Sequence, residues 1–324
     1  METTRQEYQN MLKHVLISAG LAPVEVKEHN YWFLRTQGGE YFEEFYVNDF
    51  VAIGWDDVPS KSEADRTDDL KNKMKEKYGQ PTRVLNQVYK FCEQMKAGDI
   101  VIIPSTGSAL LAFGRITDNN IYEYISTEED IEANKCPYKR RRKVEWLKTS
   151  KRNLIDPKLF TFFRNQQALA TVNDYAEFIE RAINPFYIKD NIAHLNLSVK
   201  IDKSPKATDI PYYMLGITER MKFISDKLEI DVEEPESRIN VQSHGTIEFL
   251  GEPCSIFLVA LSILALFGGS FNIWGIKLET PGLPSALSKL ADAYEKYRLA
   301  KLMVPKEKIA EIQERLHIEN PIDK

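Results

Sequence analysis

The chain has 324 residues, of which 43% are hydrophobic and 28% are charged, with only 15 Gly and 15 Pro. These values exclude collagen-like and disordered classes and leave enough chain for two cores, so we expect two folded domains. The net charge of −5 excludes a general polyanion binder, so any contact with nucleic acid must come from a local basic patch.

The cysteines and the first residues indicate where the protein resides. Cys92, Cys136 and Cys254 lie far apart, which favours a reducing compartment and excludes a disulfide framework or a zinc motif. The first ten residues carry charges of both signs and no apolar segment, so no secretory signal peptide is predicted. We therefore expect a cytoplasmic protein.

The first half begins with a predicted amphipathic helix over residues 4–19 and an aromatic strand over 31–35. The stretch 50–57 looks central, because an apolar strand there ends in Gly54 and Trp55. Gly allows close approach of a ligand, and Trp supplies a flat apolar face, so the pair is typical of a pocket wall. The alternative is a buried strand that ends in a turn, with Trp55 as a core residue.

Further along, helices are predicted over 67–78 and from Pro81, and strands over 100–104 and 109–116, joined by a turn at 105–108. Residues 144–147 look like the closing strand of the sheet. The densest basic run precedes it: Lys139, Arg140, Arg141, Arg142 and Lys143. This run is interpreted either as a solvated hairpin loop or as an edge that contacts phosphates, and the aromatic strand that follows favours the phosphate-contacting edge.

A family resemblance rests on ordered segments of this half. They are residues 31–35 (YWFLR), 52–55 (AIGW), 96–104 (KAGDIVIIP), 113–116 (FGRI) and 142–146 (RKVEW). Together they resemble PUA-like/EVE-type domains of bacterial proteins, which also occur as sensors in restriction and phage-defence proteins. The resemblance implies a mostly antiparallel β-barrel with helices at its rim and an aromatic-lined pocket for a base or nucleotide, including modified bases.

The resemblance also predicts the site. Bases would stack on Trp32, Trp55 and Trp146, and their edges would be read by polar groups. We assign edge reading to Arg35, Asp56 and the turn residues Ser105, Thr106 and Ser108. The run from Lys139 to Lys143 would contact the phosphates.

The chain is predicted to divide into a sensing domain over 1–188 and a smaller α+β domain over 189–324, so that the fold class is α+β throughout. The second domain carries an uncharged window at 253–276, with one very apolar helix over 254–267 and a strand over 271–278. A short apolar helix is more typical of a buried core than of a membrane span. The alternatives are a contact of residues 254–276 with the inner membrane or a face for homo-oligomers.

No catalytic residue, metal site or cofactor is predicted. The five His lie singly, and Glu25 and Lys27 have the local spacing of a nuclease site without the Asp that would precede them. The resemblance and the basic run lead us to expect a nucleic-acid or nucleotide sensor, coupled to a C-terminal effector in antiphage defence. Two other readings are open: a membrane-acting effector or channel gated by the first domain, and a modification-dependent nuclease.

Overall fold

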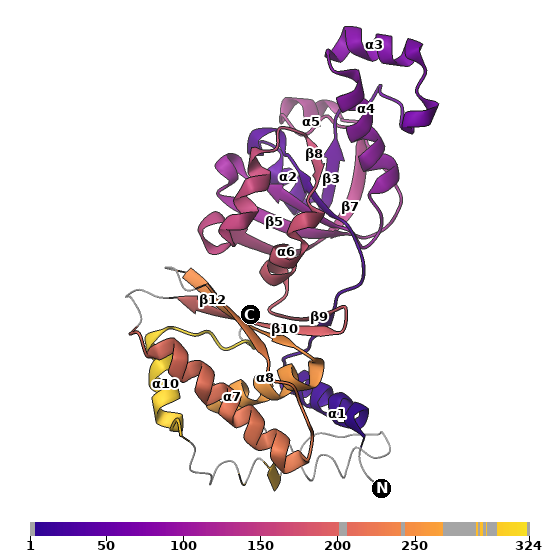
Figure 1. Cartoon of the computed structure of the whole chain (residues 1–324). Helices are drawn as coiled ribbons and strands as arrows, with labels where there is room; N and C mark the ends of the chain where they lie inside the picture. Colours follow the sequence, from indigo (N-terminus) through magenta and orange to yellow (C-terminus); the bar gives the residue numbers. More distant parts are fainter. Residues whose placement is uncertain are drawn as a thin grey trace. The chain divides into compact units, whose positions relative to one another are not determined.

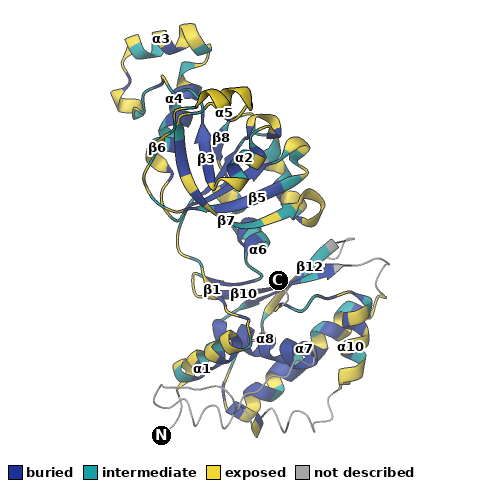
Figure 2. Ribbon diagram, turned by 180° about the vertical axis from the view of Figure 1, so that it is seen from behind, coloured by how far each residue is buried: buried dark blue, intermediate teal, exposed yellow. Residues whose placement is uncertain are grey.

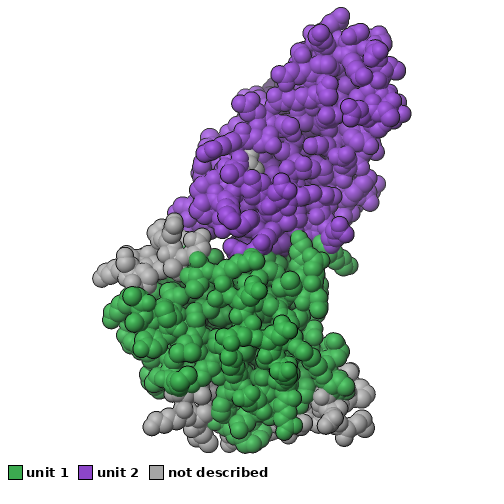
Figure 3. Space-filling model, viewed as in Figure 1, with its two compact units in different colours: residues 1–27, 184–324 green, residues 28–183 purple. Residues whose placement is uncertain are grey.

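A computed structural model of the chain describes residues 4–200, 206–240, 244–267, 290, 292–293, 296 and 303–322. They form two compact units, shown in separate colours in Figure 3. We call residues 28–183 the central unit and residues 1–27 with 184–324 the terminal unit.

The residues that make up each unit differ from the predicted division of the chain at residue 188. Residues 1–27 lie in the terminal unit because the apolar side of α1 (Arg5–Ser18) is buried in the same core as α8 (Pro253–Phe267), and because β1 (Val24–Glu25) pairs with β9 (Phe186–Lys189). The amphipathic pattern locates the helix correctly, but it does not reveal which core covers the apolar side.

The central unit is built on one curled sheet with helices around it (Figure 1). The hydrogen-bonded order is β3-β7-β5-β4-β2-β8, with β6 paired to β7, and all pairs are antiparallel except β2 with β4. The strands are β2 (Tyr31–Leu34), β3 (Phe50–Ile53), β4 (Ile100–Pro104), β5 (Leu110–Ile116), β6 (Tyr122–Glu123), β7 (Arg140–Lys151) and β8 (Leu169–Thr171). The helices are α2 (Phe42–Val47), α3 (Asp68–Tyr78), α4 (Pro81–Tyr89), α5 (Glu128–Glu132) and α6 (Ala176–Ile183).

The sheet is covered on both faces. In β2, Trp32 and Leu34 belong to one apolar cluster, whereas Tyr31 and Phe33 belong to another. Alternate side chains of a strand point to opposite faces, so β2 separates two cores and reads as a continuous apolar run. Figure 2 shows β3 and most of β5 buried, whereas α3 is mostly exposed. The α+β class is confirmed, and the sheet is a half-barrel whose paired order ends at β3 and β8.

Four of the five residues of the basic run, from Arg140 to Lys143, lie in β7, whereas one of the two interpretations of the run was a solvated hairpin loop. β7 begins at Arg140 and lies between β3 and β5, so it is an interior strand, not the closing strand predicted at 144–147. Its register against β5 shifts between Phe113 and Gly114. A Cβ at Gly114 would overlap Val144 Cγ1 and lie 2.7 Å from Trp146 Cε3, so the irregular pairing needs a residue without a side chain there.

The terminal unit has a second sheet, ordered β1-β9-β10-β12-β11, packed with α7 and α8 (Figure 1). Its other elements are β10 (Ile192–Lys200), α7 (Asp209–Leu228), β11 (Glu236–Asn240), β12 (His244–Gly251) and α10 (Lys306–Arg315). The predicted apolar helix is α8, and its residues from Cys254 to Leu266 are buried. This part of the proposed membrane-contact segment is therefore core, and residues 268–276, with the predicted strand over 271–278, lie outside the described residues.

In the part of the chain that the structure describes, the helices are too short or too polar to cross a membrane.

The close contact at Gly114 leads to a stability prediction. We expect Gly114→Ala to lower the free energy of unfolding by about 1–3 kcal/mol, because the added methyl group overpacks the contact with Val144 and Trp146. Urea denaturation measures the change. Thr149→Ala, at an exposed position of the same strand pair, should stay within about 0.5 kcal/mol of wild type, and equal effects of the two substitutions would contradict the overpacking.

Candidate functional site

The central unit contains a cavity of about 830 Å³, which lies within the usual size range of small-molecule sites. Its walls come from the end of β2, from β3 and the turn after it, from the α3–α4 junction, from α4 and from the segment before β8. β3 and the segment that leads into β8, the two ends of the sheet order, thus meet at one cavity, because the sheet curls. The lining residues are Leu34, Arg35, Gln37, Gly38, Ala52, Ile53, Gly54, Trp55, Tyr78, Gly79, Gln80, Arg83, Val84, Gln87, Tyr138, Gln166 and Ala168.

Trp55 stands on strained backbone at the wall of this cavity. Its φ is 63°, a conformation that bulky residues rarely adopt and that costs roughly 1–3 kcal/mol. Two contacts hold it there: the N–H of Val58 donates to the Trp55 carbonyl at 2.9 Å, and Nη1 of Arg140 donates to the same oxygen at 3.3 Å. The indole is half-buried against two apolar clusters, which fixes its orientation.

Tyr138 forms the adjoining wall. A Cβ at Gly54 would lie 3.1 Å from Cε1 of Tyr138, so the Gly allows the ring to approach the main chain. The Tyr138 hydroxyl donates to Oε1 of Gln37 at 3.5 Å, and the ring meets Tyr41 edge-on at 5.5 Å. Burial, with smaller contributions from Tyr41 and Cys136, raises the pKa of Tyr138 to about 12.

Two guanidinium groups give the cavity its charge. Arg35 donates from Nε to the Asn165 carbonyl at 2.8 Å and from Nη2 to the Phe163 carbonyl at 2.7 Å. Arg83 donates to the Gln166 carbonyl and, at 3.4 Å, to Oε1 of Gln80. The described lining residues include no Asp or Glu, so both cations face the cavity without a carboxylate in its wall. Such a site favours an anionic ligand.

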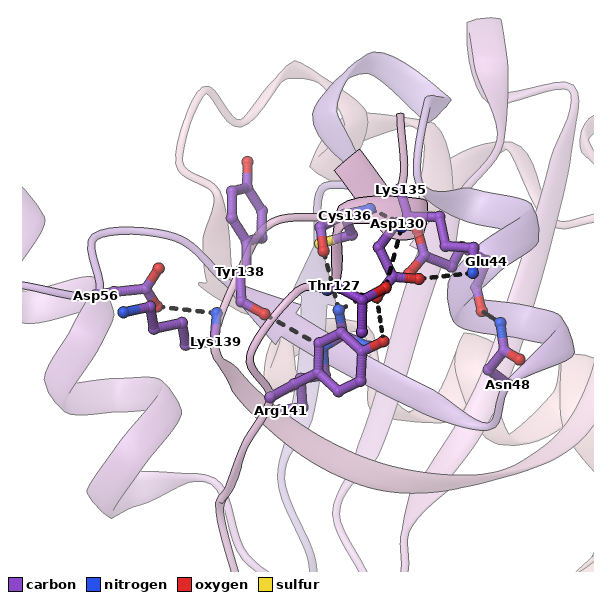
Figure 4. A network of polar contacts seen from close by, with 11 residues as sticks. Glu44, Asn48, Asp56, Thr127, Asp130, Lys135, Cys136, Tyr138, Lys139 and Arg141 are labelled. Carbon is purple, nitrogen blue, oxygen red and sulfur yellow. Dashed lines mark hydrogen bonds and ion pairs between the residues drawn. The ribbon is translucent and has the colours of Figure 1, made fainter. Parts of the chain in front are cut away.

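Arg141 does not belong to a phosphate-contacting edge as predicted, because it is buried. Its guanidinium lies 4.2 Å from the Phe50 ring centroid and 3.7 Å from that of Tyr124, and it donates to the carbonyls of Cys136 at 2.9 Å and Tyr138 at 3.2 Å. Figure 4 shows Arg141 pointing toward this loop. The side chain of Arg141 points into the protein, where its hydrogen bonds hold the loop that carries Tyr138.

The prediction that Arg142 contacts phosphates is also wrong, because its side chain is buried. It is 1% exposed, and it donates from Nε to the Phe91 carbonyl and from Nη2 to the Cys92 carbonyl, both at 2.8 Å. These carbonyls belong to the π-helical turn Lys90–Gln94, which continues α4. Arg142 therefore fixes the helix that carries Arg83.

The other members of the run have separate positions. Arg140 is half-buried and donates to the carbonyls of Trp55 at 3.3 Å and Asp56 at 3.0 Å. Lys139 and Lys143 are exposed. The main-chain N–H of Lys139 donates to Oδ1 of Asp56 at 3.1 Å, so Asp56 anchors the Tyr138 loop and does not line the cavity (Figure 4).

The three predicted stacking residues do not come together. Trp32 is 1% exposed, and its indole N–H donates to Oδ2 of Asp99 at 2.8 Å, so it is core. Trp146 packs against Tyr46 at 5.6 Å between ring centroids and is not among the lining residues. Trp55 alone lines the cavity, because the two other indoles lie on strand positions that face packed side chains.

Ser105, Thr106 and Ser108 lie beside the cavity without lining it. Their turn joins β4 to β5, and the N–H of Leu110 donates to Oγ of Ser105 at 2.9 Å. Gly39 packs so closely on the main chain of Thr106 that a Cβ would overlap it. The turn therefore supports the segment that contributes Gln37 and Gly38 to the wall.

Sequence reasoning missed several lining residues. Tyr138 stands directly before the basic run, so aromatic and basic character were adjacent in the sequence and offered a signal. Arg83 and Gln80 follow the Tyr-Gly end of α3, which reads only as a helix junction. Gln166 lies in a polar stretch before a short strand, where no pattern marks it.

The comparisons with known proteins add one match. A family model described as a domain of unknown function (DUF8426) matches residues 32–172, which is less than half of the chain and falls within the central unit. No curated protein matches the chain. Among the described residues there is no group of three or more His, Cys, Asp or Glu arranged to hold a metal ion.

The two adjacent residues Arg142 and Lys143 give a matched stability test. Arg142→Met should lower the free energy of unfolding by about 2–4 kcal/mol, because it leaves the buried carbonyls of Phe91 and Cys92 without donors. Lys143→Met, at an exposed position, should change it by less than about 0.5 kcal/mol. Urea denaturation compares them, and similar losses for both would show that Arg142 does not have this role.

Proposed function

We propose that the central unit reads a nucleobase, presented as a nucleotide or within a nucleic acid, with a fold of the PUA-like/EVE type. One observation carries the proposal: the cavity combines the half-buried indole of Trp55 and the ring of Tyr138 with two arginines, and its described lining has no carboxylate. A flat aromatic ring and a phosphate are the two parts of a nucleotide that such walls match.

The chemistry divides between the two sides of the cavity. Stacking on an indole contributes on the order of 1–3 kcal/mol and tolerates any base. Arg35 and Arg83 supply charge-assisted donors for phosphate oxygens, which are stronger than neutral hydrogen bonds. The amides of Gln37, Gln80 and Gln166 offer both donors and acceptors for the edge of a base.

The resemblance of the central unit to sensor domains extends the proposal to the whole chain. In that proposal the terminal unit is the effector or oligomerising part of a bacterial antiphage system. The central unit needs no catalytic group for this role, because sensing requires only that the ligand binds.

The indole gives the first test of the proposal. Trp55→Leu should weaken binding of nucleoside monophosphates or short single strands by about 1–3 kcal/mol, because the stacking face is lost. Trp146→Leu removes an indole that lies outside the cavity and should leave the affinity unchanged. Isothermal titration calorimetry on both folded variants measures this. A wild-type chain that binds none of these ligands, or a Trp55→Leu variant that binds as wild type does, would refute the proposal.

Arg83 gives a second test, directed at the phosphate. Arg83→Gln should reduce the preference for a nucleoside monophosphate over the same nucleoside by at least about tenfold, since a hydrogen bond to a charged group contributes about 1.5–3 kcal/mol. The affinity for the nucleoside itself should change little. Lys73→Gln, on the exposed helix α3 and outside the lining, serves as the control. An unchanged preference in Arg83→Gln would place the phosphate elsewhere.

A further inference from the structure

A second cavity, of about 630 Å³, lies in the central unit and has no role in the function proposed above. It is lined by Ala109, Leu110, Lys151, Arg152, Asn153 and Phe160. Like the first cavity, it combines an aromatic ring with cations, and its described lining includes no Asp or Glu.

The register of the sheet places the two cavities at the same end of it. Parallel pairing of Phe33 with Ile102 brings the end of β2, and hence Arg35, beside Pro104 at the end of β4. Pro104 pairs with Leu111, and the preceding residue Leu110 pairs with Lys151. Three steps between neighbouring strands thus separate Arg35 from Lys151, a distance of about 14 Å.

Phe163 connects the cavities directly. Its carbonyl accepts a hydrogen bond from Arg35 of the first cavity at 2.7 Å, and its ring centroid lies 5.2 Å from the guanidinium carbon of Arg152 in the second. The turn that carries Thr106 lies between them as well, because it packs on Gly39 on one side and bonds to Leu110 on the other. Phe163 and the turn that carries Thr106 thus contact residues of both linings or residues next to them.

The second cavity has an available cation. Arg152 is exposed, its guanidinium carbon lies 4.9 Å from the Phe160 ring centroid, and it forms no ion pair in the part of the chain that the structure describes. Lys151 and Arg164 are exposed nearby in the sequence. The nearby carboxylate of Asp156 has other partners: it accepts a hydrogen bond from the N–H of Lys158 at 2.9 Å and lies 3.6 Å from Nη1 of Arg181.

We infer that the central unit binds a single-stranded nucleic acid across both cavities, not a free nucleotide. One base enters the first cavity, the chain crosses the turn that carries Thr106, and a neighbouring base stacks on Phe160 while Arg152 and Lys151 contact its phosphates. A duplex would keep its base faces stacked on one another, so two aromatic walls at a spacing of a few nucleotides fit an unpaired strand. This inference rests on the proposed function of the first cavity.

The experiment compares single strands of about eight nucleotides, a length within the site sizes of such surfaces, with the corresponding mononucleotides. RNA and DNA homopolymers are titrated separately, to distinguish the two sources of the same chemistry. The variants are Arg152→Glu and Lys96→Glu. Both change the charge equally at exposed positions, but Lys96 precedes β4 at the opposite end of the sheet.

We expect the wild-type chain to bind the octanucleotide at least about tenfold more tightly than the mononucleotide, and Arg152→Glu to abolish this difference, because it removes a phosphate contact. Mononucleotide binding should stay within about twofold in both variants, and Lys96→Glu should retain the preference. Equal binding of octanucleotide and mononucleotide, or equal effects of the two variants, would overturn the inference and leave the first site standing. Binding of neither probe by the wild-type chain would overturn the proposed function and this inference with it.

Discussion

The candidate site depends on one kind of interaction, in which guanidinium groups of a single strand donate to main-chain carbonyls of other segments. Arg140, Arg141 and Arg142 follow one another in β7 and reach the turn after β3, the loop before β7 and the turn after α4. A guanidinium group has five N–H donors, and a buried carbonyl without a donor is costly. The arginines therefore supply hydrogen bonds to irregular main chain near the cavity, where no neighbouring strand supplies them.

This arrangement explains why strained backbone persists at the cavity. A Trp with positive φ is retained only where its surroundings determine its position. Val58 and Arg140 bond to the Trp55 carbonyl, Gly54 leaves space for Tyr138, and Arg141 fixes the loop that brings Tyr138 there. The hydrogen bonds from β7 thus position Trp55 and Tyr138 side by side in the wall of the cavity.

The elements were largely predictable from the sequence, and the placement of side chains was only partly so. The periodicity located α1, β4, β5 and α8 to within a few residues, because local apolar patterns determine these elements. The sequence also predicted a wall at Gly54 and Trp55, and both residues line the cavity. The role of the buried arginines in the basic run was not predicted. Arg140 and Arg142 donate to carbonyls that lie some 50 residues or more away in the sequence, and no local pattern reveals these partners.

The same anchors determine what kind of binding the cavity supports. Trp55, Tyr138 and Arg83 are held by main-chain contacts that exist without a ligand, so little conformational entropy remains to be lost when one binds. Arg35 and Arg83 already donate to carbonyls, yet those partners carry no charge, and a phosphate would add the opposite charge that the wall lacks. Specificity would then reside in the shape between the rings and in the glutamine amides, because charge alone does not distinguish one nucleotide from another.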